Sequence, residues 1–252
     1  MNDRWRENGV SVLNNVVARS DIERLQSTII SIFNQVFIDI HFESVVSLGD
    51  AVFDSAVIQA REGDPVRFSY FYDLCQTNIA VNGLFASKPV VSAVAELLAC
   101  DEKAISWSGS LVRMDVPKDL KNTIGWHQDH HYLPFNKLGV GLVVTVPLVN
   151  VTSEMGAVQV IPGSNNKGVI EVFSEEDKPL GSKQLLIDET SIDFDNVEIL
   201  EGTVGSMICL DTRTVHRSGF NTSDKVRWSV LMRFHNCLDA NFAPFRRYQT
   251  VL

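Results

Sequence analysis

The sequence predicts a mainly β protein, an antiparallel sandwich or jelly roll with helices packed on its outside. Helical spacing of apolar residues marks the first hundred or so residues. After Asp101, short β-rich runs follow one another and are separated by turn residues. No repeat, low-complexity segment or linker interrupts the chain. We therefore expect one domain over residues 1–252, with a helix-rich part at about 1–100 and a β core at about 101–235.

Three elements are expected in the helix-rich part. Residues 9–13 alternate apolar and polar side chains and predict a short strand. Ser20 or Asp21 can cap a helix that runs to about Phe37, since apolar residues recur there at helical spacing. A second helix is expected from Pro89 to Leu98, because proline is well tolerated in a first helical turn.

The β core is divided by turn residues such as Pro117, Gly202 and the stretch 219–224. Residues 164–200 are polar and acidic, and predict a long excursion with one or two strands. Strands are expected near 105–115, 124–129, 140–149, 157–161, 203–210, 213–218 and 226–234.

Composition limits the function. The chain has 22 basic and 31 acidic residues and a net charge of −9, which disfavours nucleic-acid and anionic-membrane partners. It contains no run of 18 apolar residues and no apolar signal-peptide core, so a cytoplasmic location is expected. The four cysteines form no C-x-x-C pair and are expected to be buried or half-buried free thiols. A small-molecule ligand fits these properties, and the oligomeric state stays open.

A possible metal site lies in the stretch 126–132, which holds three of the six histidines. In a strand, alternate side chains share a face, so His127 and Asp129 should point the same way. His216 offers a third ligand. Two histidines and one carboxylate leave coordination positions open for a co-substrate and O₂, as non-haem Fe(II) oxygenases require.

An isolated H-x-D is a weak signal, and other histidines compete for the ligand role. His130 is adjacent to Asp129, and His131 has no acidic partner two residues on, so spacing favours His127. His41 and His235 are interpreted as structural or surface residues.

Arg227 strengthens the metal hypothesis, because it follows His216 by eleven residues in an otherwise apolar run. A buried arginine needs an anionic partner, and its planar fork suits the far carboxylate of 2-oxoglutarate. Ser218 shares a face with His216, and Ser229 shares one with Arg227, so either hydroxyl could add a hydrogen bond. Without this role, Arg227 would be an ordinary surface residue of a strand.

Three segments together resemble the phytanoyl-CoA dioxygenase (PhyH-like) family of Fe(II)/2-oxoglutarate oxygenases. They are H-Q-D-H-H-Y-L-P-F at 127–135, E-M-G-A-V-Q-V-I-P-G-S at 154–164, and H-R-S-G with Arg227 from 216 onward. The opening W-R-E-N-G-V at 5–10, followed by the helix near Asp21, also resembles the family's first strand and helix. The usual G-S/T-H after the proline is Gly163-Ser164-Asn165 here, and residues 40–80 match nothing in the family pattern.

The resemblance implies a double-stranded β-helix, a cupin-like jelly roll with iron at one open end. It implies Fe(II) on His127, Asp129 and His216, 2-oxoglutarate on Arg227 with Ser218 as a weaker contact, and O₂ as oxidant. The expected activity is that of a dioxygenase hydroxylating a small organic molecule, as in natural-product biosynthesis. Candidate pocket residues directly follow the metal motif: Gln128, Tyr132, Leu133 and Phe135.

Several alternatives stay open on the same cofactors. They are desaturation, cyclisation, epimerisation and hydroxylation of an acyl-CoA or lipid. A binding protein without turnover is a further alternative. A halogenase is disfavoured because it would replace the carboxylate ligand by a small residue, and Asp129 is present.

Overall fold

The computed structural model describes residues 3–42, 46–120, 123–133, 140–174 and 184–241. Its α-helices lie in the N-terminal part of the chain: α1 (Asp3–Asn8), α2 (Arg19–Val36), α3 (Ala51–Gly63), α4 (Pro65–Gln76), α5 (Ile79–Phe85) and α6 (Lys88–Leu98). Short 3₁₀ helices interrupt the later part, including η3 (Asp129–Tyr132). The N-terminal strand β1 (Val10–Leu13) joins the sheet formed by the later strands.

The strands in the described part of the chain pair antiparallel in three sheets. The major sheet has the order β1, β8 (Met207–Asp211), β3 (Gly141–Pro147), β10 (Arg227–Asn236), β2 (Ile105–Asp115). The minor sheet has the order β7 (Glu198–Leu200), β4 (Val158–Val160), β9 (His216–Ser218). A separate hairpin consists of β5 (Val172–Ser174) and β6 (Leu185–Ile187).

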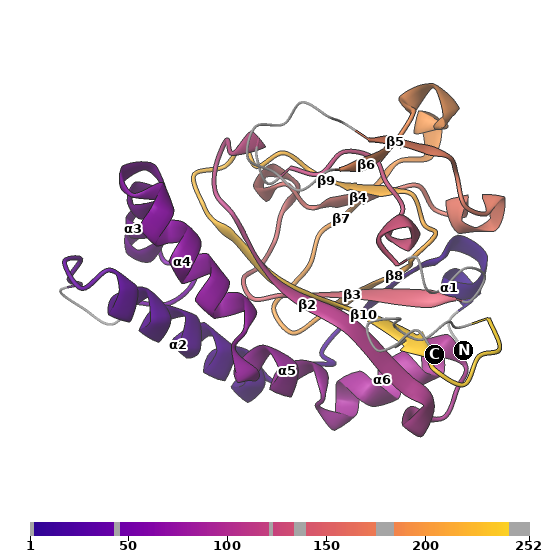
Figure 1. Ribbon diagram of the computed structural model, residues 1–252, viewed down its shortest axis with the longest axis horizontal. Helices are drawn as coiled ribbons and strands as arrows, with labels where there is room; N and C mark the ends of the chain where they lie inside the picture. Colours follow the sequence, from indigo (N-terminus) through magenta and orange to yellow (C-terminus); the bar gives the residue numbers. More distant parts are fainter. Residues whose placement is uncertain (1–2, 43–45, 121–122, 134–139, 175–183, 242–252) are drawn as a thin grey trace, which may run out of the picture.

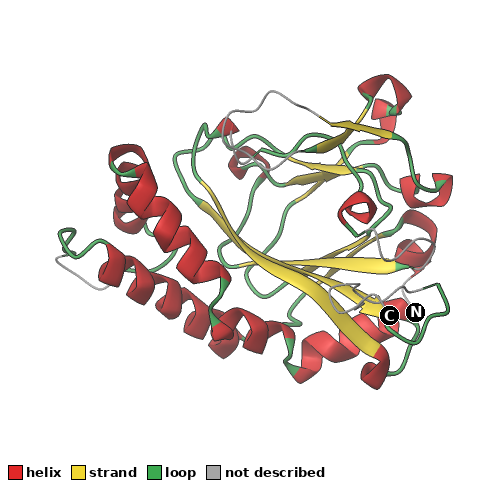
Figure 2. Cartoon of the chain, viewed as in Figure 1, coloured by secondary structure: helices red, strands yellow, loops and turns green. Residues whose placement is uncertain are grey.

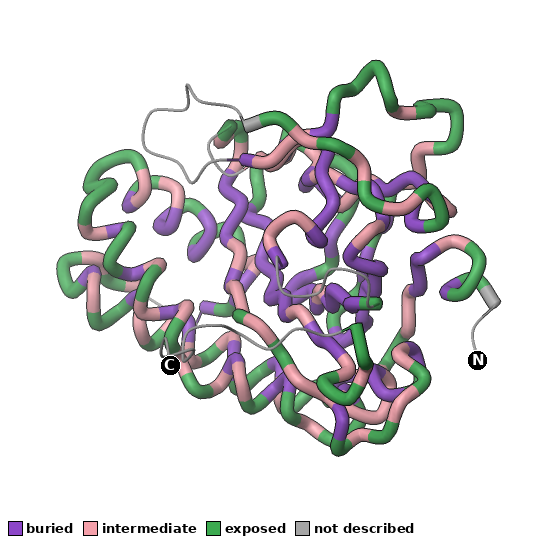
Figure 3. The backbone as a smooth tube through the Cα atoms, turned by 45° about the vertical axis from the view of Figure 1, so that its right-hand side comes forward, coloured by how far each residue is buried: buried purple, intermediate pink, exposed green. Residues whose placement is uncertain are grey.

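Helices α2 to α6 lie in a row along one face of the major sheet, and the minor sheet lies on the opposite side (Figure 1). Figure 2 shows the same division into a helical and a strand layer. The outer surfaces of the helices are exposed while the strands between the layers are largely buried (Figure 3). This is the jelly roll with helices packed outside that the sequence predicts, and the expected fold class is confirmed.

Strand β10 shows how alternation in the sequence separates the two faces of the major sheet. Trp228, Val230 and Met232 belong to the large apolar core against the helices. Arg227 and Arg233, at odd positions, line a cavity inside the roll instead. A smaller apolar cluster closes the interior between the sheets, with Val10, Val143, Val160, Leu200, Ile208 and Leu210.

Two glycines let the loops beside the minor sheet cross. Gly156 has a φ of +78°, and a Cβ there would lie 2.5 Å from the carbonyl oxygen of Gly219. A Cβ on Gly219 would lie 2.6 Å from the carbonyl oxygen of Ala157. Any side chain at either position would collide with backbone, which explains the glycine of the 154–164 motif physically.

The observed elements agree with some expectations and correct others. The strand at 9–13 and the helix from Pro89 onward are found, and the helix expected to end near Phe37 ends at Val36. Its N-cap is Ala18, however, without a side-chain hydrogen bond, so the capping role of Ser20 or Asp21 was wrong. Within residues 164–200, the described residues form three short strands rather than one or two.

Residues 124–129 do not form the expected strand. In the described part of the chain they contribute one isolated β-bridge at His127, and Asp129 already begins helix η3. All four cysteines are free thiols, but Cys237 is exposed rather than buried. No single helix among the described residues is long and apolar enough to cross a membrane, although α5 and α6 pass that test together despite a 55° bend between them.

Candidate metal and co-substrate site

The two histidines of the candidate metal site are paired through their backbones. The amide of His127 donates to the carbonyl of His216 at 2.9 Å, and the amide of His216 donates to the carbonyl of His127 at 3.0 Å. Their ring centroids lie 4.2 Å apart. The bridge therefore sets the two imidazoles side by side on one face of the roll.

Each imidazole is also oriented by a second backbone contact. Nδ1 of His127 lies 2.8 Å from the carbonyl oxygen of Gly125, and Nδ1 of His216 lies 2.9 Å from that of Thr214. Because a carbonyl only accepts hydrogen bonds, both Nδ1 atoms must carry the proton. Both Nε2 atoms then present lone pairs, as metal-ligating histidines with this second contact do.

Asp129 completes the cluster from the first residue of η3, two residues after His127. Its Oδ1 lies 3.4 Å from Nε2 of His127. One ligand atom from each of His127, Asp129 and His216 lies within 4.8 Å of the others, and all three residues are buried. The expected cluster thus forms, but a bridge followed by a helical turn, not strand alternation, brings Asp129 to the histidines.

Charges around the cluster favour metal binding. Burial alone would raise the pKa of Asp129, but the positive charge of Arg233 outweighs it and holds that pKa well below its ordinary range. Burial lowers the pKa of His216 to about 4, so its imidazole is neutral at physiological pH. A carboxylate and a neutral imidazole are the forms that bind a divalent cation without first losing a proton.

Arg227 stands opposite Asp115 in the pairing of β10 with β2. Its Nε and Nη2 both donate to Oδ2 of Asp115, at 3.0 Å and 2.7 Å. Its Nη1 is buried and has no hydrogen-bond partner among the described residues. A buried guanidinium with one unsatisfied corner fits an additional anion.

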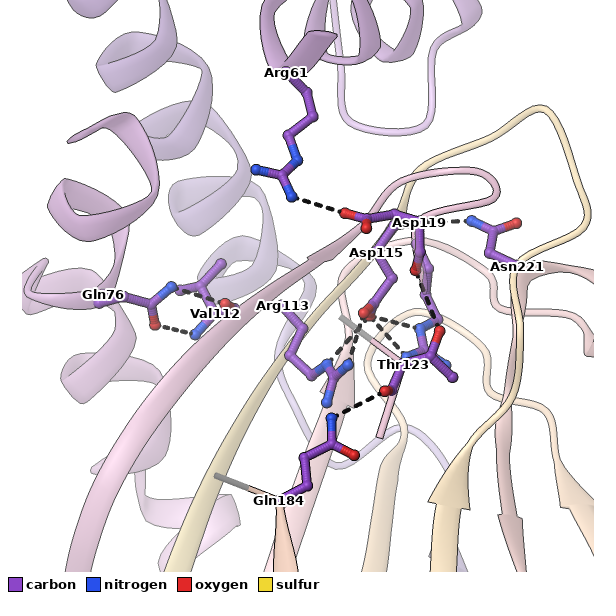
Figure 4. Close-up of polar contacts among 10 residues, drawn as sticks. Arg61, Gln76, Val112, Arg113, Asp115, Asp119, Thr123, Gln184 and Asn221 are labelled. Atoms are coloured by element: carbon purple, nitrogen blue, oxygen red, sulfur yellow. Dashed lines mark hydrogen bonds and ion pairs between the residues drawn. The ribbon is translucent and has the colours of Figure 1, made fainter. Parts of the chain in front are cut away.

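Asp115 is held between two arginines. Arg113 also donates to it, from Nε at 3.2 Å and from Nη2 at 2.7 Å, and Figure 4 shows the two side chains pointing toward each other. Burial would raise the pKa of Asp115, but the charges and hydrogen bonds of Arg113 and Arg227 lower it to about 2. One carboxylate is therefore shared by two cations.

Two cavities meet at the metal cluster. The inner one, about 80 Å³, reaches into the roll and is lined by Arg227, Ser218 and Ser229 together with His127, Asp129 and His216. All six residues predicted to bind metal or co-substrate therefore line the same cavity. The outer cavity, about 280 Å³, is lined by Tyr72, Leu111, Arg113, Met114, Asp115, Ile124, His127, Asp129, Tyr132, Gln184 and Arg233.

The expected pocket residues divide into different groups. Tyr132 lines the outer cavity, and its ring packs edge-on against His127 at 5.9 Å. Gln128 is fully buried and bonds to backbone, donating to Gly168 and Arg213 and accepting from the amide of Ile170, so its expected pocket role is corrected to a structural one. Leu133 is buried and lines neither cavity. Phe135 lies outside the described residues.

Sequence reasoning missed several side chains of the site. Tyr72 comes from α4, in the part of the chain that matched no family motif, and Gln184 comes from the segment before β6. Gln184 donates to the carbonyl of Thr123 at 3.2 Å, which fixes it beside the metal segment (Figure 4). For Arg113 and Asp115, the available signal was two charged residues that alternate with the apolar residues Val112 and Met114 at the end of a predicted strand.

The other histidines stand outside the cluster. His130 and His131 are in η3 but share no metal-binding group with the ligands among the described residues. His235 is buried on β10 with Nε2 3.1 Å from the hydroxyl of Ser108, as expected for a structural residue. His41 is exposed.

A jelly roll that presents two histidines and one carboxylate at one end defines the class of mononuclear non-haem metal proteins with open coordination positions. The chain belongs to the phytanoyl-CoA dioxygenase (PhyH) family, whose profile matches residues 5–229. This confirms the family expected from the sequence and, with it, the enzyme class of 2-oxoglutarate-dependent non-haem iron oxygenases. No curated protein sequence matches the chain.

Solved structures share the fold at low sequence identity. EvdO2 from Micromonospora carbonacea var. aurantiaca, complexed with 2-oxoglutarate, is 19% identical with a TM-score of 0.64, covering 93% of this chain and 89% of its own. AviO1 from Streptomyces viridochromogenes is 15% identical with a TM-score of 0.59, covering 96% and 95%. The epimerase SnoN, in complex with Fe³⁺, α-ketoglutarate and nogalamycin RO, is 17% identical with a TM-score of 0.56, covering 93% and 81%.

Proposed function

We propose that this oxygenase binds Fe(II) on His127, Asp129 and His216, holds 2-oxoglutarate in the inner cavity, and oxidises a small organic molecule of a biosynthetic pathway in the outer cavity. The observation that carries the proposal is one cavity lined both by the metal cluster and by Arg227, whose buried Nη1 has no hydrogen-bond partner among the described residues. Iron with a bound keto acid would supply the oxidising chemistry, and the protein supplies orientation and exclusion of water.

Each polar group of the inner cavity has a place in this proposal. The keto-acid end of 2-oxoglutarate can bind metal directly, whereas its far carboxylate needs a cation. Arg227 lies deep in the roll and offers Nη1, while Ser218 and Ser229 line the same cavity and offer hydroxyls. The apolar residues Leu200, Ile208 and Leu210 surround the space and keep its dielectric low, which strengthens a charge-assisted hydrogen bond.

A biosynthetic substrate is supported by the functions of proteins with a similar structure. SnoN is described as an epimerase of nogalamycin biosynthesis, and its structure shares this architecture. An acyl-CoA substrate is disfavoured by the net charge of −9, because a nucleotide phosphate tail needs basic surface residues.

Anaerobic titration with Fe(II) and then 2-oxoglutarate tests the cofactor sites. The expected result is one iron per chain and an absorbance change when the keto acid joins it. Succinate formation in air, followed with a metabolite pool, then tests turnover. Mass spectrometry distinguishes the outcomes, since hydroxylation adds one oxygen atom, desaturation removes two hydrogens, and epimerisation leaves the mass unchanged. Absence of both iron binding and succinate would contradict the proposal.

A further inference from the structure

Charged groups around the two cavities do not cancel, even when the proposed iron and 2-oxoglutarate, on which this step rests, are included. Apart from the ligand histidines, the inner cavity is lined by Arg113, Arg217, Arg227, Arg233 and Asp129, and the outer cavity adds Asp115. Even with Arg217 left aside, three arginines face two carboxylates, an excess of one positive charge. Since Fe(II) and the 2-oxoglutarate dianion neutralise each other, the excess remains in the loaded site.

The contacts locate this excess at Arg233. Asp115 neutralises Arg113, which donates two hydrogen bonds to it. The far carboxylate of 2-oxoglutarate would neutralise Arg227. The two positive charges of Fe(II) would be balanced by Asp129 and by the keto-acid carboxylate. Arg233 donates to both carboxylate oxygens of Asp129, from Nε at 2.9 Å and from Nη2 at 3.2 Å. With iron bound, Asp129 would therefore no longer fully balance the charge of Arg233.

Arg233 is placed to meet a further anion. Its side chain is 21% exposed and lines both cavities, directly beside a metal ligand. Its hydrogen bonds leave from Nε and Nη2, so Nη1 has no partner in the part of the chain that the structure describes. A largely buried cation without a counter-charge is costly, and a ligand that brings an anion removes that cost.

A further arginine lines the inner cavity but supplies no compensation. The guanidinium of Arg217 stacks on the ring of Trp126 at 4.7 Å, and its Nε donates to Gln159 at 2.7 Å. The charge of Arg217 adds to the positive charge of the cavity lining, so the lining residues carry a net excess of at least one positive charge.

We propose that the substrate is a small organic acid that binds as an anion in the outer cavity, with its acidic group on Arg233 and its oxidisable part beside the metal. The rest of that cavity suits such a molecule. Leu111, Met114 and Ile124 offer apolar contacts. Tyr72 offers a hydroxyl that stays protonated, because burial raises its pKa to about 12.

Three probes with the same ring and different charge test the proposal: benzoate, benzamide and benzylamine. Each is titrated anaerobically into the protein loaded with Fe(II) and saturating 2-oxoglutarate, and binding is followed by the change in the iron–co-substrate absorbance. Benzoate should bind at least about tenfold more tightly than benzamide, which corresponds to one charge-assisted hydrogen bond. Benzamide or benzylamine binding as tightly as benzoate, or benzoate abolishing the absorbance by displacing the co-substrate, would overturn the proposal.

Variants assign the effect to one residue. Arg233→Met should remove the preference for benzoate, and Arg233→Lys should retain part of it. Arg61→Met is the matched control, because Arg61 pairs with Asp119 at 3.0 Å and lines neither cavity (Figure 4). The absorbance is recorded before any probe is added, so its absence in the wild type counts against the proposed function alone. The wild-type comparison of the three probes remains decisive if Arg233→Met fails to hold iron.

Discussion

Arg227 and Asp115 face each other directly across strands β10 and β2, and Nε and Nη2 of the arginine donate to the same carboxylate oxygen. This leaves the Nη1 corner of the guanidinium without a partner among the described residues. Asp115 therefore orients the guanidinium of Arg227 and leaves one of its nitrogens available. Because the guanidinium is already held in place, it loses little conformational entropy when it binds a second carboxylate.

The first prediction concerns this arginine. Arg227→Ala should weaken 2-oxoglutarate binding by at least about tenfold, because charge-assisted hydrogen bonds contribute roughly 1.5–3 kcal/mol each. Iron binding should stay nearly intact, and Arg227→Lys should restore affinity only in part, since it keeps the charge and loses the fork. The measurement is the anaerobic 2-oxoglutarate titration. Unchanged affinity would mean that another cation, such as Arg217 or Arg233, holds the far carboxylate.

The second prediction concerns the metal. His216→Ala should lose most of its bound iron, because it removes one of three buried ligand atoms and leaves a two-residue site. Iron per chain, measured after reconstitution and desalting, checks this. His41→Ala, at an exposed histidine, serves as the control and should bind iron like the wild type. Full iron content in His216→Ala would refute the ligand assignment, whereas nickel or zinc in a purified sample would not, since the same ligands accept both.

The third prediction concerns pH and His235. Burial lowers the pKa of His235 from 6.5 to about 4, so between these pH values the unfolded chain holds the additional proton. The free energy of unfolding should therefore fall as the pH decreases from about 6.5 to 4, by up to about 1.4 kcal/mol per pH unit for this one residue. His235→Gln should reduce that slope in urea unfolding across this range relative to the wild type. An identical slope in the variant and the wild type would contradict the prediction.

The fourth prediction concerns the contact between the helical layer and β10. Asp54 of α3 is buried and accepts hydrogen bonds from the amide of Val226 at 3.0 Å and from Nε1 of Trp228 at 3.2 Å. Asp54→Ala leaves two buried donors unsatisfied and should lower the free energy of unfolding by roughly 2–4 kcal/mol. Urea unfolding measures this, with exposed Asp73→Ala as a control that should change it by less than about 0.5 kcal/mol. Equal stability of the two variants would show that Asp54 does not anchor the strand.

The closeness of His127 and Asp129 could be predicted because the two residues are two positions apart in the sequence. The turn residues after His216 likewise predict that Arg227 lies on the following strand. Asp115, the partner of Arg227, could not be predicted in the same way. It lies on a strand distant in sequence, and the register of two paired strands depends on the whole sheet rather than on either segment.

Helix α4 shows why part of the helical layer was missed. Its aromatic residues at 68, 70, 71 and 72 favour a strand by intrinsic preference, yet Phe68, Phe71 and Cys75 pack on one buried face of a helix. Tertiary packing decided the conformation. The start signal was present, since Asp64 caps the helix by accepting from the amide of Arg67 and Pro65 occupies its first turn.

The reciprocal backbone bridge between His127 and His216 has a consequence for how the protein gains and loses its metal. Two of the three proposed ligands are spaced by main-chain hydrogen bonds that need no ion, and their rings are fixed by carbonyls of Gly125 and Thr214. Metal binding is then separate from folding, unlike in small zinc domains that unfold when stripped. A chelator should yield an intact empty protein with an almost unchanged circular dichroism spectrum, and fresh Fe(II) should refill it without a refolding phase. Oxidative loss of iron would be a repairable event for this enzyme rather than the start of its degradation.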